Sequence, residues 1–211
     1  MSFRDDFDRP PLAPLPGTSA PRRALFVDRW GTLLEPPPAD PRRAYSRLSF
    51  VPGTLDALFR ATQAGWRVYL LGNEEAVARG HVQPARWERF ESEMLSELAK
   101  AGVRVERCYA CLDHPEHGKG AHLRDSVFLL PNTGAMYHAR QHDGIDLKSS
   151  WVIGDSTLEL AAGWRAGCRT AGVRSGLGLA DQELETDVEL VADDLAAVLD
   201  EILELARAAH R

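Results

Sequence analysis

The sequence has few cysteines, few lysines and no long apolar run. Its 3 cysteines, Cys108, Cys111 and Cys168, are an odd number that excludes a complete disulfide framework and is typical of a reducing compartment. No run of about 18 apolar residues occurs, and the N-terminus lacks the apolar stretch of an export signal. We therefore expect a cytoplasmic protein that neither spans a membrane nor is secreted.

Positive charge is also scarce. Lysine and arginine total 25 against 31 acidic residues, which gives a net charge of −6 at pH 7. Nucleic acids and anionic membranes bind surfaces with an excess of basic side chains, so neither partner is expected. The lysines are Lys100, Lys119 and Lys148. Any site for an anionic ligand must therefore be built locally.

Two regions differ in composition. Residues 1–22 are rich in proline and poor in periodic apolar residues, so they cannot bury enough surface to offset chain entropy. We predict a flexible, Pro-rich arm over residues 1–22 and one folded domain over residues 23–211. Prolines pre-organise extended chain, so docking of the arm on a protein partner remains an alternative.

From residue 24 onward, short apolar stretches alternate with amphipathic ones. The predicted strands are "ALFV", "RVYLLG", "VRVERCYA", "WVIG", "RTAGV" and a short "VELVA". The predicted helices are "PGTLDALFRATQAG", "PARWERFESEMLSELAKAG", residues 133–143, "TLELAAGWRAG" and residues 193–208. This alternation predicts a Rossmann-like three-layer α/β/α sandwich with a mostly parallel sheet.

Ligands of such sheets bind beyond the carboxyl ends of the strands. Here Asp28 follows the first strand, Gly72 and Asn73 end the second, and Asp155 follows "WVIG". Two carboxylates brought together repel unless a cation joins them, and Mg²⁺ prefers oxygen ligands. The sequence therefore predicts a magnesium site at Asp28 and Asp155, with the Thr32 hydroxyl against the outer face of Asp28.

Four segments, in order, are similar to motifs of a known superfamily. "FVDRWGTLLE" resembles its "DRDG" signature, and "LLGNEEAVARG" resembles "TNQSGIARG". "MLSELAKAGVRVERCYACLDHPEHGKG" is similar to the run leading into a zinc loop, and "GIDLKSSWVIGDSTLELAAGWRAGCRTAGV" to a closing motif. The chain resembles the haloacid dehalogenase (HAD) superfamily, in the capless branch of heptose-1,7-bisphosphate phosphatases and histidinol-phosphate phosphatases. This implies a HAD-like domain without a large cap over residues 23–211.

The resemblance also implies roles for individual residues. Asp28 takes the position of the nucleophile, which forms an aspartyl phosphate. Mg²⁺ would be held by Asp28, the carbonyl of Trp30, Asp155 and Glu159. The implied substrate-binding residues are Arg29, Gly72, Asn73 and Arg79.

Three positions depart from the family pattern. Trp30 replaces an aspartate that transfers protons, Gly72 replaces a Thr or Ser hydroxyl, and Leu130 replaces a lysine that neutralises charge. A positioned acid–base contributes about 10²–10⁴ in rate and one electrostatic donor about 10²–10³. Of the three lysines, only Lys119 lies in a loop that could reach the site. Little ordinary phosphatase activity is therefore expected.

These departures predict a binding or regulatory pseudoenzyme, in which the Trp30 indole closes or repurposes the phosphate pocket. Its partner would be a small phosphorylated molecule or a protein. The alternative is a slow or atypical Mg²⁺-dependent phosphatase that acts through Asp28 on a small phosphorylated sugar or histidinol-like metabolite. Carbon–halogen hydrolysis is a further option, since superfamily dehalogenases have an aromatic residue at the Trp30 position; so is a purely structural subunit. The sequence leaves the oligomeric state open.

Zinc is not expected. The zinc loop of the branch uses a Cys-x-His and a Cys-x-Cys pair, whereas only Cys111 aligns here, with Asp113, Ser126 and Phe128 at other ligand positions. An alternative zinc set, with ligand types at even spacing, is Cys108, Cys111, His114 and His117. The remaining loop and helix histidines are predicted to lie on the surface: His122, His138 and His142.

Overall fold

The structure is a computed structural model that describes residues 22–208 of the chain. Except for Arg22, the predicted Pro-rich arm of residues 1–22 lies outside the described residues.

A six-stranded parallel sheet forms the middle layer. Its strands are β1 (Ala24–Asp28), β2 (Arg67–Asn73), β3 (Val105–Cys111), β4 (Trp151–Gly154), β5 (Arg169–Val173) and β6 (Leu190–Ala192). They lie in the order β3-β2-β1-β4-β5-β6, and every neighbouring pair is parallel. All of β1 is buried, as expected for a strand covered on both faces. The order reverses at β1, which makes the carboxyl ends of β1 and β4 a natural place for a ligand.

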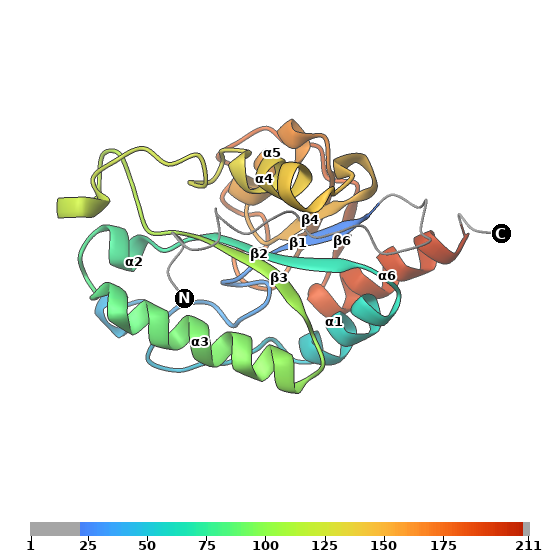
Figure 1. The fold of residues 1–211 in the computed structure, drawn as a ribbon, viewed down its shortest axis with the longest axis horizontal. Helices are drawn as coiled ribbons and strands as arrows, with labels where there is room; N and C mark the ends of the chain where they lie inside the picture. Colours follow the sequence, from blue (N-terminus) through green and yellow to red (C-terminus); the bar gives the residue numbers. More distant parts are fainter. Residues whose placement is uncertain (1–21, 209–211) are drawn as a thin grey trace.

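Helices cover both faces of the sheet, which confirms the predicted three-layer sandwich (Figure 1). On one face lie α1 (Thr54–Gln63), α3 (Pro84–Lys100) and α6 (Leu195–Ala208); on the other lie α4 (Gly134–Asp143) and α5 (Thr157–Ala166). The single-turn helix α2 (Glu75–Ala78) follows β2. Three 3₁₀ turns complete the elements: Pro41–Arg43, Gly120–His122 and Leu147–Ser149. Each helix of residues 22–208 is too short or too polar to cross a bilayer.

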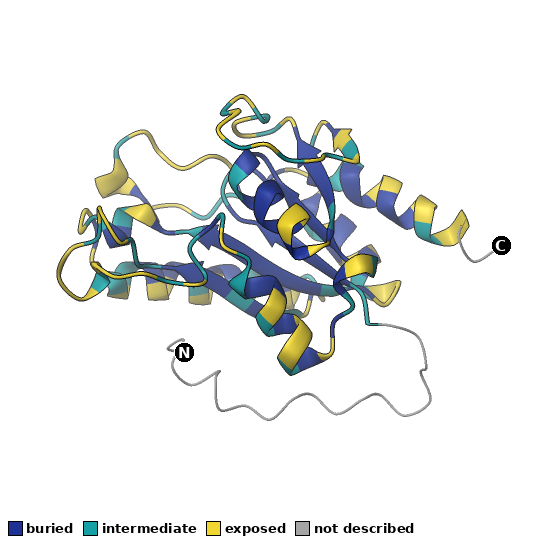
Figure 2. Cartoon of the chain, turned by 90° about the horizontal axis from the view of Figure 1, so that it is seen from above, coloured by how far each residue is buried: buried dark blue, intermediate teal, exposed yellow. Residues whose placement is uncertain are grey.

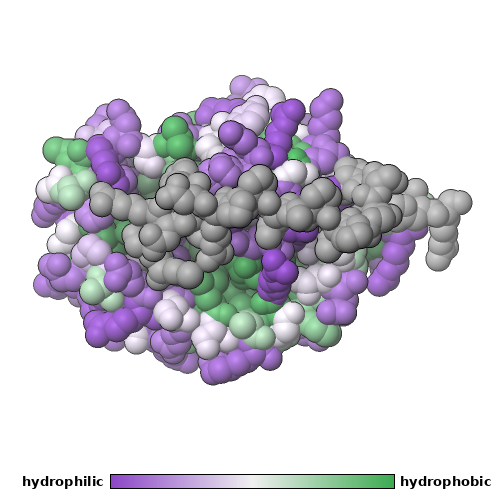
Figure 3. Space-filling model, in the orientation of Figure 1, coloured by the Kyte–Doolittle hydropathy of each residue, from purple (hydrophilic) through white to green (hydrophobic). Residues whose placement is uncertain are grey.

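Two apolar clusters lie on opposite faces of the sheet, seen as dark blue in Figure 2. Successive residues of a strand point to opposite faces, so Leu25 and Val27 join the cluster under α1, α3 and α6. Ala24 and Phe26 join the cluster under α4 and α5. Hydrophilic side chains rim the face drawn in Figure 3.

The edge formed by the carboxyl ends of the strands is crossed by three irregular segments. These are the β1–α1 connection (residues 29–53), the β3–α4 loop (residues 112–133) and the β5–β6 segment (residues 174–189). Within the described residues they contain only 3₁₀ turns and isolated bridges, so no large cap covers this edge. Side chains at the strand ends can therefore be reached by a small molecule.

Candidate active site

Three carboxylates meet at the ends of two neighbouring strands. Asp28 is the last residue of β1, Asp155 directly follows β4, and Glu159 lies in the first turn of α5. One oxygen of each lies within 4.8 Å of the others, and all three residues are buried. Hard oxygen ligands at this separation fit a divalent cation such as Mg²⁺. The predicted metal ligands Asp28, Asp155 and Glu159 are thus brought together.

Burial raises the pKa of each carboxyl group, and nearby negative charge adds to this effect. Burial raises the pKa of Asp155 to about 6 and that of Glu159 to about 7. The pKa of Asp28 lies well above its ordinary value because the group is buried and because Glu159 and Asp155 add negative charge. A cation among the three would remove this repulsion. The electrostatics of the cluster therefore favour a bound cation.

Local hydrogen bonds orient Glu159 and Asp155. Ser156 is the N-cap of α5; its N–H donates to Glu159 Oε1 (2.6 Å) and its hydroxyl donates to Oε2 (2.7 Å), which forms a capping box. Asp155 Oδ2 accepts the Leu177 N–H at 2.6 Å. A Cβ at Gly154 would lie 2.1 Å from Glu159 Cγ, so β4 must end in glycine for Glu159 to occupy the site.

Two glycines pack directly against Asp155. Gly31 and Gly176 have φ angles of 83° and 66°, which favour glycine. A Cβ at Gly31 would lie 2.1 Å from Asp155 Oδ2, and one at Gly176 would lie 2.0 Å from it. The β1–α1 connection and the β5–β6 segment therefore meet over this carboxylate. The Thr32 hydroxyl, expected to hold Asp28, finds no hydrogen-bond partner among residues 22–208.

The Trp30 indole packs against two aromatic rings, Phe90 of α3 and Tyr45. It stacks on Phe90 with ring centroids 5.5 Å apart and lies 6.1 Å from the Tyr45 ring, while Nε1 donates to Glu74 Oε2 at 3.4 Å. Within residues 22–208 the contacts of the ring are with these groups and not with the three carboxylates, contrary to the expectation that it closes the phosphate pocket. None of the backbone–backbone hydrogen bonds in the loops of residues 22–208 uses the Trp30 carbonyl oxygen as acceptor. This oxygen therefore remains available as a ligand beside Asp28.

Arg29, a predicted substrate-binding residue, is fully buried in an ion pair. Its Nε donates to Glu74 Oε1 at 2.9 Å, and its Nη2 donates to Glu74 and to the Gly72 carbonyl. The Tyr45 hydroxyl donates to Glu74 Oε2 at 2.7 Å. Sequence reasoning missed Glu74, because nothing in "GNEEA" distinguishes it from the exposed Glu75. Through these hydrogen bonds the Arg29 guanidinium links the end of β1 to the end of β2.

Gly72 and Asn73 end β2 beside the nucleophile position. A Cβ at Gly72 would lie 2.9 Å from Arg29 Nη2 and 3.2 Å from Asp28 Oδ1, so a Thr or Ser here would displace Arg29. Asn73 uses both ends of its amide on Leu130: Nδ2 donates to the carbonyl (3.2 Å) and Oδ1 accepts the N–H (2.9 Å). Asn73, another predicted substrate-binding residue, therefore anchors the β3–α4 loop to β2.

Two basic side chains lie at α2, next to this strand end. Arg79 directly follows α2, is partly exposed and pairs with Glu75 at 3.0 Å. The Lys119 N–H donates to the Ala78 carbonyl, and the Lys119 stem lies over Gly80.

Comparison with known proteins identifies the family. A model of HAD-hydrolase-like proteins matches residues 130–198. The D-glycero-alpha-D-manno-heptose-1,7-bisphosphate 7-phosphatase of Burkholderia mallei is 31% identical over 180 residues, which cover 84% of this chain and 88% of that protein. The chain belongs to the heptose-1,7-bisphosphate 7-phosphatase family of HAD hydrolases.

This chain is also similar to other members of the family. The D-glycero-beta-D-manno-heptose-1,7-bisphosphate 7-phosphatase of Bordetella bronchiseptica is 34% identical over 161 residues, covering 74% of this chain and 84% of that protein. A crystal structure of D,D-heptose 1,7-bisphosphate phosphatase from B. bronchiseptica, complexed with magnesium and phosphate, superposes with a TM-score of 0.75. It is 28% identical and covers 87% of this chain and 99% of that chain.

These relatives correct the predicted function. They are named as phosphatases, so the prediction of a binding or regulatory pseudoenzyme is wrong, and the alternative of a phosphatase fits better. The structure supplies a physical reason: the three carboxylates stay together, and the Trp30 indole is held by Phe90 and Tyr45. Substitution of a proton-transfer residue by tryptophan did not dismantle the carboxylate cluster.

The β3–α4 loop is held by an ion-pair network centred on Asp113. Its Oδ1 pairs with His122 Nδ1 at 2.9 Å, and its Oδ2 accepts from Arg124 Nε at 2.8 Å. The Cys111 thiol donates to the Asp113 carbonyl at 3.4 Å. At its far end the loop leads into Leu130, whose side chain packs in the apolar cluster under α4. His122 is thus a loop contact and not the bare surface residue that was predicted.

The four residues of the alternative zinc set do not come together. Cys108 accepts from Arg29 at 3.5 Å, Cys111 contacts Asp113, and His114 and His117 stack on each other with centroids 4.6 Å apart. Within residues 22–208, Asp28, Asp155 and Glu159 form the one group of three or more metal-ligating side chains.

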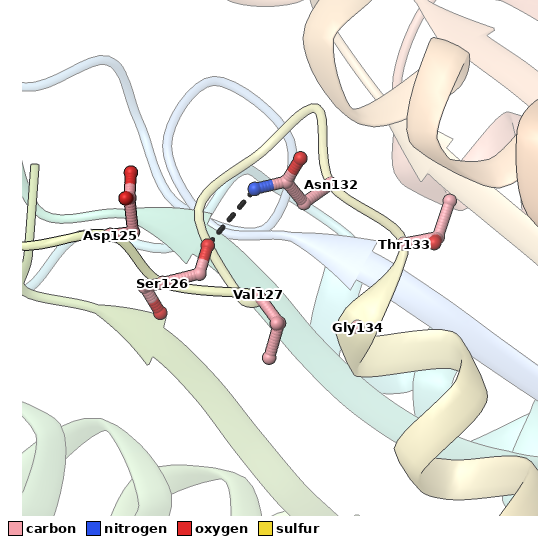
Figure 4. A pocket seen from close by; sticks show the side chains of 6 residues that line it. All are labelled: Asp125, Ser126, Val127, Asn132, Thr133 and Gly134. Atoms are coloured by element: carbon pink, nitrogen blue, oxygen red, sulfur yellow. Dashed lines mark hydrogen bonds between the residues drawn. The ribbon is translucent and has the colours of Figure 1, made fainter. Parts of the chain in front are cut away.

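An open cavity of about 470 Å³ lies where the β3–α4 loop enters α4 (Figure 4). The Asn132 Nδ2 donates to the Ser126 carbonyl at 2.9 Å across it. Its lining surface is mainly apolar and is formed by Asp125, Ser126, Val127, Asn132, Thr133 and Gly134. Sequence reasoning did not single out this cavity, because its walls come from a segment without periodic pattern.

Proposed function

We propose that the chain hydrolyses a small phosphorylated sugar in the presence of Mg²⁺, with Asp28 as nucleophile. The observation that carries this proposal is the group of three buried carboxylates, Asp28, Asp155 and Glu159, with oxygens within 4.8 Å of one another. Burial, with nearby negative charge, raises their pKa values, so the charged carboxylates are disfavoured without a cation and a bound cation would stabilise them. The magnesium and phosphate bound by the B. bronchiseptica relative support this choice of ligand.

The residues divide into three roles. Asp28 attacks phosphorus, the bond from phosphorus to the sugar oxygen breaks, and water then cleaves the aspartyl phosphate and restores Asp28. Asp155, Glu159 and the Trp30 carbonyl would hold the cation beside Asp28. When bound, Mg²⁺ offsets the negative charge of the carboxylates and the phosphoryl group. Arg79, which follows α2, and Lys119 of the β3–α4 loop are the basic side chains that contact the substrate.

Trp30 cannot transfer a proton to the leaving oxygen. Trp30 offers no titratable group, so the leaving oxygen takes its proton from water. A positioned acid–base is worth about 10²–10⁴ in rate, so the enzyme is slow with ordinary sugar phosphates. A leaving group that departs without a proton avoids this penalty. The structure therefore predicts that activity depends steeply on the acidity of the leaving group.

The substrate class follows from the relatives and from the β3–α4 loop. The relatives are heptose-1,7-bisphosphate 7-phosphatases, which makes a phosphorylated sugar the first candidate, with a histidinol-like phosphate as the second. The sugar lies towards the β3–α4 loop, where Asn132, Ser126 and Asp125 offer polar groups at an otherwise largely apolar cavity. The Asp113 network fixes the shape of this loop, so the preference of this chain among sugars depends on it.

Phosphate release with Mg²⁺ tests the proposal. The panel includes D-glycero-D-manno-heptose 1,7-bisphosphate, histidinol phosphate, sugar monophosphates and 4-nitrophenyl phosphate. We expect turnover that chelation abolishes and that Asp28→Asn removes, with 4-nitrophenyl phosphate at least about 10²-fold faster than an alkyl phosphate. Equal turnover in Asp28→Asn would show that the nucleophile is assigned wrongly, and absence of turnover on every substrate would reject the proposal.

A further inference from the structure

The β5–β6 segment (residues 174–189) holds Asp155 from the outside. The Leu177 N–H donates to Asp155 Oδ2 at 2.6 Å, and the Leu179 N–H donates to the Asp155 carbonyl at 2.7 Å. Gly176 lies so close that a Cβ there would be 2.0 Å from Asp155 Oδ2. The segment follows β5 and is drawn in orange near α5 in Figure 1. The segment thus binds Asp155 Oδ2 and the Asp155 carbonyl directly.

The backbone of this segment is not one that it would adopt alone. Leu179 and Gln182 have φ angles of 64° and 47°, in the left-handed region that side chains disfavour. Gly176 and Gly178 share this region, with φ angles of 66° and 58°. A conformation of this kind persists only where surrounding contacts enforce it. Contacts with α5 and Asp155 must therefore hold the segment in place.

Asp181 makes the contact that ties the segment to α5. Its Oδ2 accepts the Thr157 N–H at 2.9 Å and also accepts the Thr157 hydroxyl hydrogen. The Thr157 Oγ1 in turn accepts the Leu184 N–H at 3.2 Å, which ties the segment to α5 at a second residue. Thr157 is the first residue of α5, between Asp155 and Glu159 in the chain. A carboxylate here also suits the positive end of the helix dipole.

We propose that Asp181 is a positioning residue of the metal site: it pins the β5–β6 segment to α5 so that the Leu177 N–H fixes Asp155. It also places a fourth carboxylate near the three that meet the cation. After burial, the charge of Asp181 contributes to the raised pKa of Asp155, which places the two groups within electrostatic reach. This inference rests on the proposed function, because it assumes that the carboxylates bind Mg²⁺.

Binding of Mg²⁺ to the whole chain, measured by isothermal titration calorimetry, tests this role without recourse to turnover. Both substitutions at Asp181 weaken its contact with Thr157 and remove one negative charge near the cation. Mg²⁺ binding is therefore expected to weaken about three- to tenfold in Asp181→Asn and about tenfold or more in Asp181→Ala. Glu183→Gln is the matched control, because it removes the same charge from an exposed position of the same segment. Its Mg²⁺ affinity is expected to stay within twofold of the unaltered chain.

Kinetics separate positioning from a loss of folding. In Asp181→Asn, kcat at saturating Mg²⁺ is expected to recover to within about twofold, because the reacting groups are intact. A variant damaged in folding would stay slow at every Mg²⁺ concentration. Unchanged Mg²⁺ affinity in both Asp181 variants, or an equal loss in Glu183→Gln, would overturn the inference. If the unaltered chain binds no Mg²⁺ at all, the proposed function itself fails.

Discussion

Removal of Mg²⁺ is expected to make the protein less stable as pH rises. Burial raises the pKa of Asp155 to about 6 and that of Glu159 to about 7, from ordinary values of 3.8 and 4.5. Between pH 4 and 7 the folded chain therefore binds more protons than the unfolded chain. This stability is fully present below the ordinary values and is lost as pH rises through about 6 and 7.

The magnitude follows from the shifts. One pKa unit corresponds to about 1.4 kcal/mol, so a shift of about two units in either group is worth roughly 3 kcal/mol. The two groups share one site and their effects do not simply add, so we take about 3 kcal/mol as the scale. For a domain of this size that is a change of about 6–12 °C in Tm. Asp143, whose pKa is lowered mainly through Arg107 and Tyr69 against the effect of its burial, acts only at more acidic pH.

Thermal unfolding at pH 5 and pH 8, each with chelator or with Mg²⁺, measures this effect. With chelator the Tm is expected to be higher at pH 5; with Mg²⁺ the value at pH 8 should rise to meet it. Glu159→Gln keeps an acceptor for the capping box and removes one charge, so it should be more stable than the unaltered chain at pH 8 without Mg²⁺. A Tm at pH 8 that does not respond to Mg²⁺ would refute the reasoning.

Three further substitutions test separate parts of the site. Gly31→Ala places a Cβ 2.1 Å from Asp155 Oδ2 at a φ of 83°, so the stabilisation by Mg²⁺ seen in thermal unfolding should be largely lost. Glu74→Ala leaves the Arg29 guanidinium buried without its carboxylate, and urea unfolding should show a loss of about 3–5 kcal/mol, with a smaller loss in Glu74→Gln. Asp113→Ala releases the β3–α4 loop, so limited proteolysis should cut within residues 112–133 sooner while calorimetry shows unchanged Mg²⁺ affinity.

The fold could be predicted because its signals are local. Stretches such as "ALFV" and "WVIG" are buried on both faces, and each is followed by a segment of helical period, so the strands and their parallel order could be expected. The carboxylates at Asp28 and Asp155 were visible for the same reason: each stands where an apolar stretch stops. Rules for parallel sheets then bring those stops to one edge.

Side-chain directions could not be predicted in this way. The orientation of Trp30 depends on Phe90 of α3 and on Tyr45 of the irregular β1–α1 connection, contacts that the sequence pattern does not specify. Glu74 is buried only because Arg29 turns back from β1 to meet it. A prediction that placed the Trp30 ring in the phosphate pocket went beyond the sequence pattern, since the direction of the ring is set by tertiary contacts that the pattern does not contain.

The contacts of the β3–α4 loop and the β5–β6 segment could not be predicted, for a second reason. Neither has a repeating apolar period, so contacts such as Asp113 with His122 and Asp181 with Thr157 leave no trace in the pattern. Each is nevertheless a specific hydrogen-bonded pair of a carboxylate. These two segments are therefore the parts of the site that the sequence pattern predicts least.

The most direct test of the account is a crystal structure with Mg²⁺ and beryllium fluoride, which mimics a phosphoryl group on a carboxylate. The account predicts the fluoride on Asp28, the cation in contact with Asp28, Asp155 and Glu159, and the Trp30 ring still stacked on Phe90. A cation bound elsewhere, or an indole lying where the fluoride should be, would contradict it.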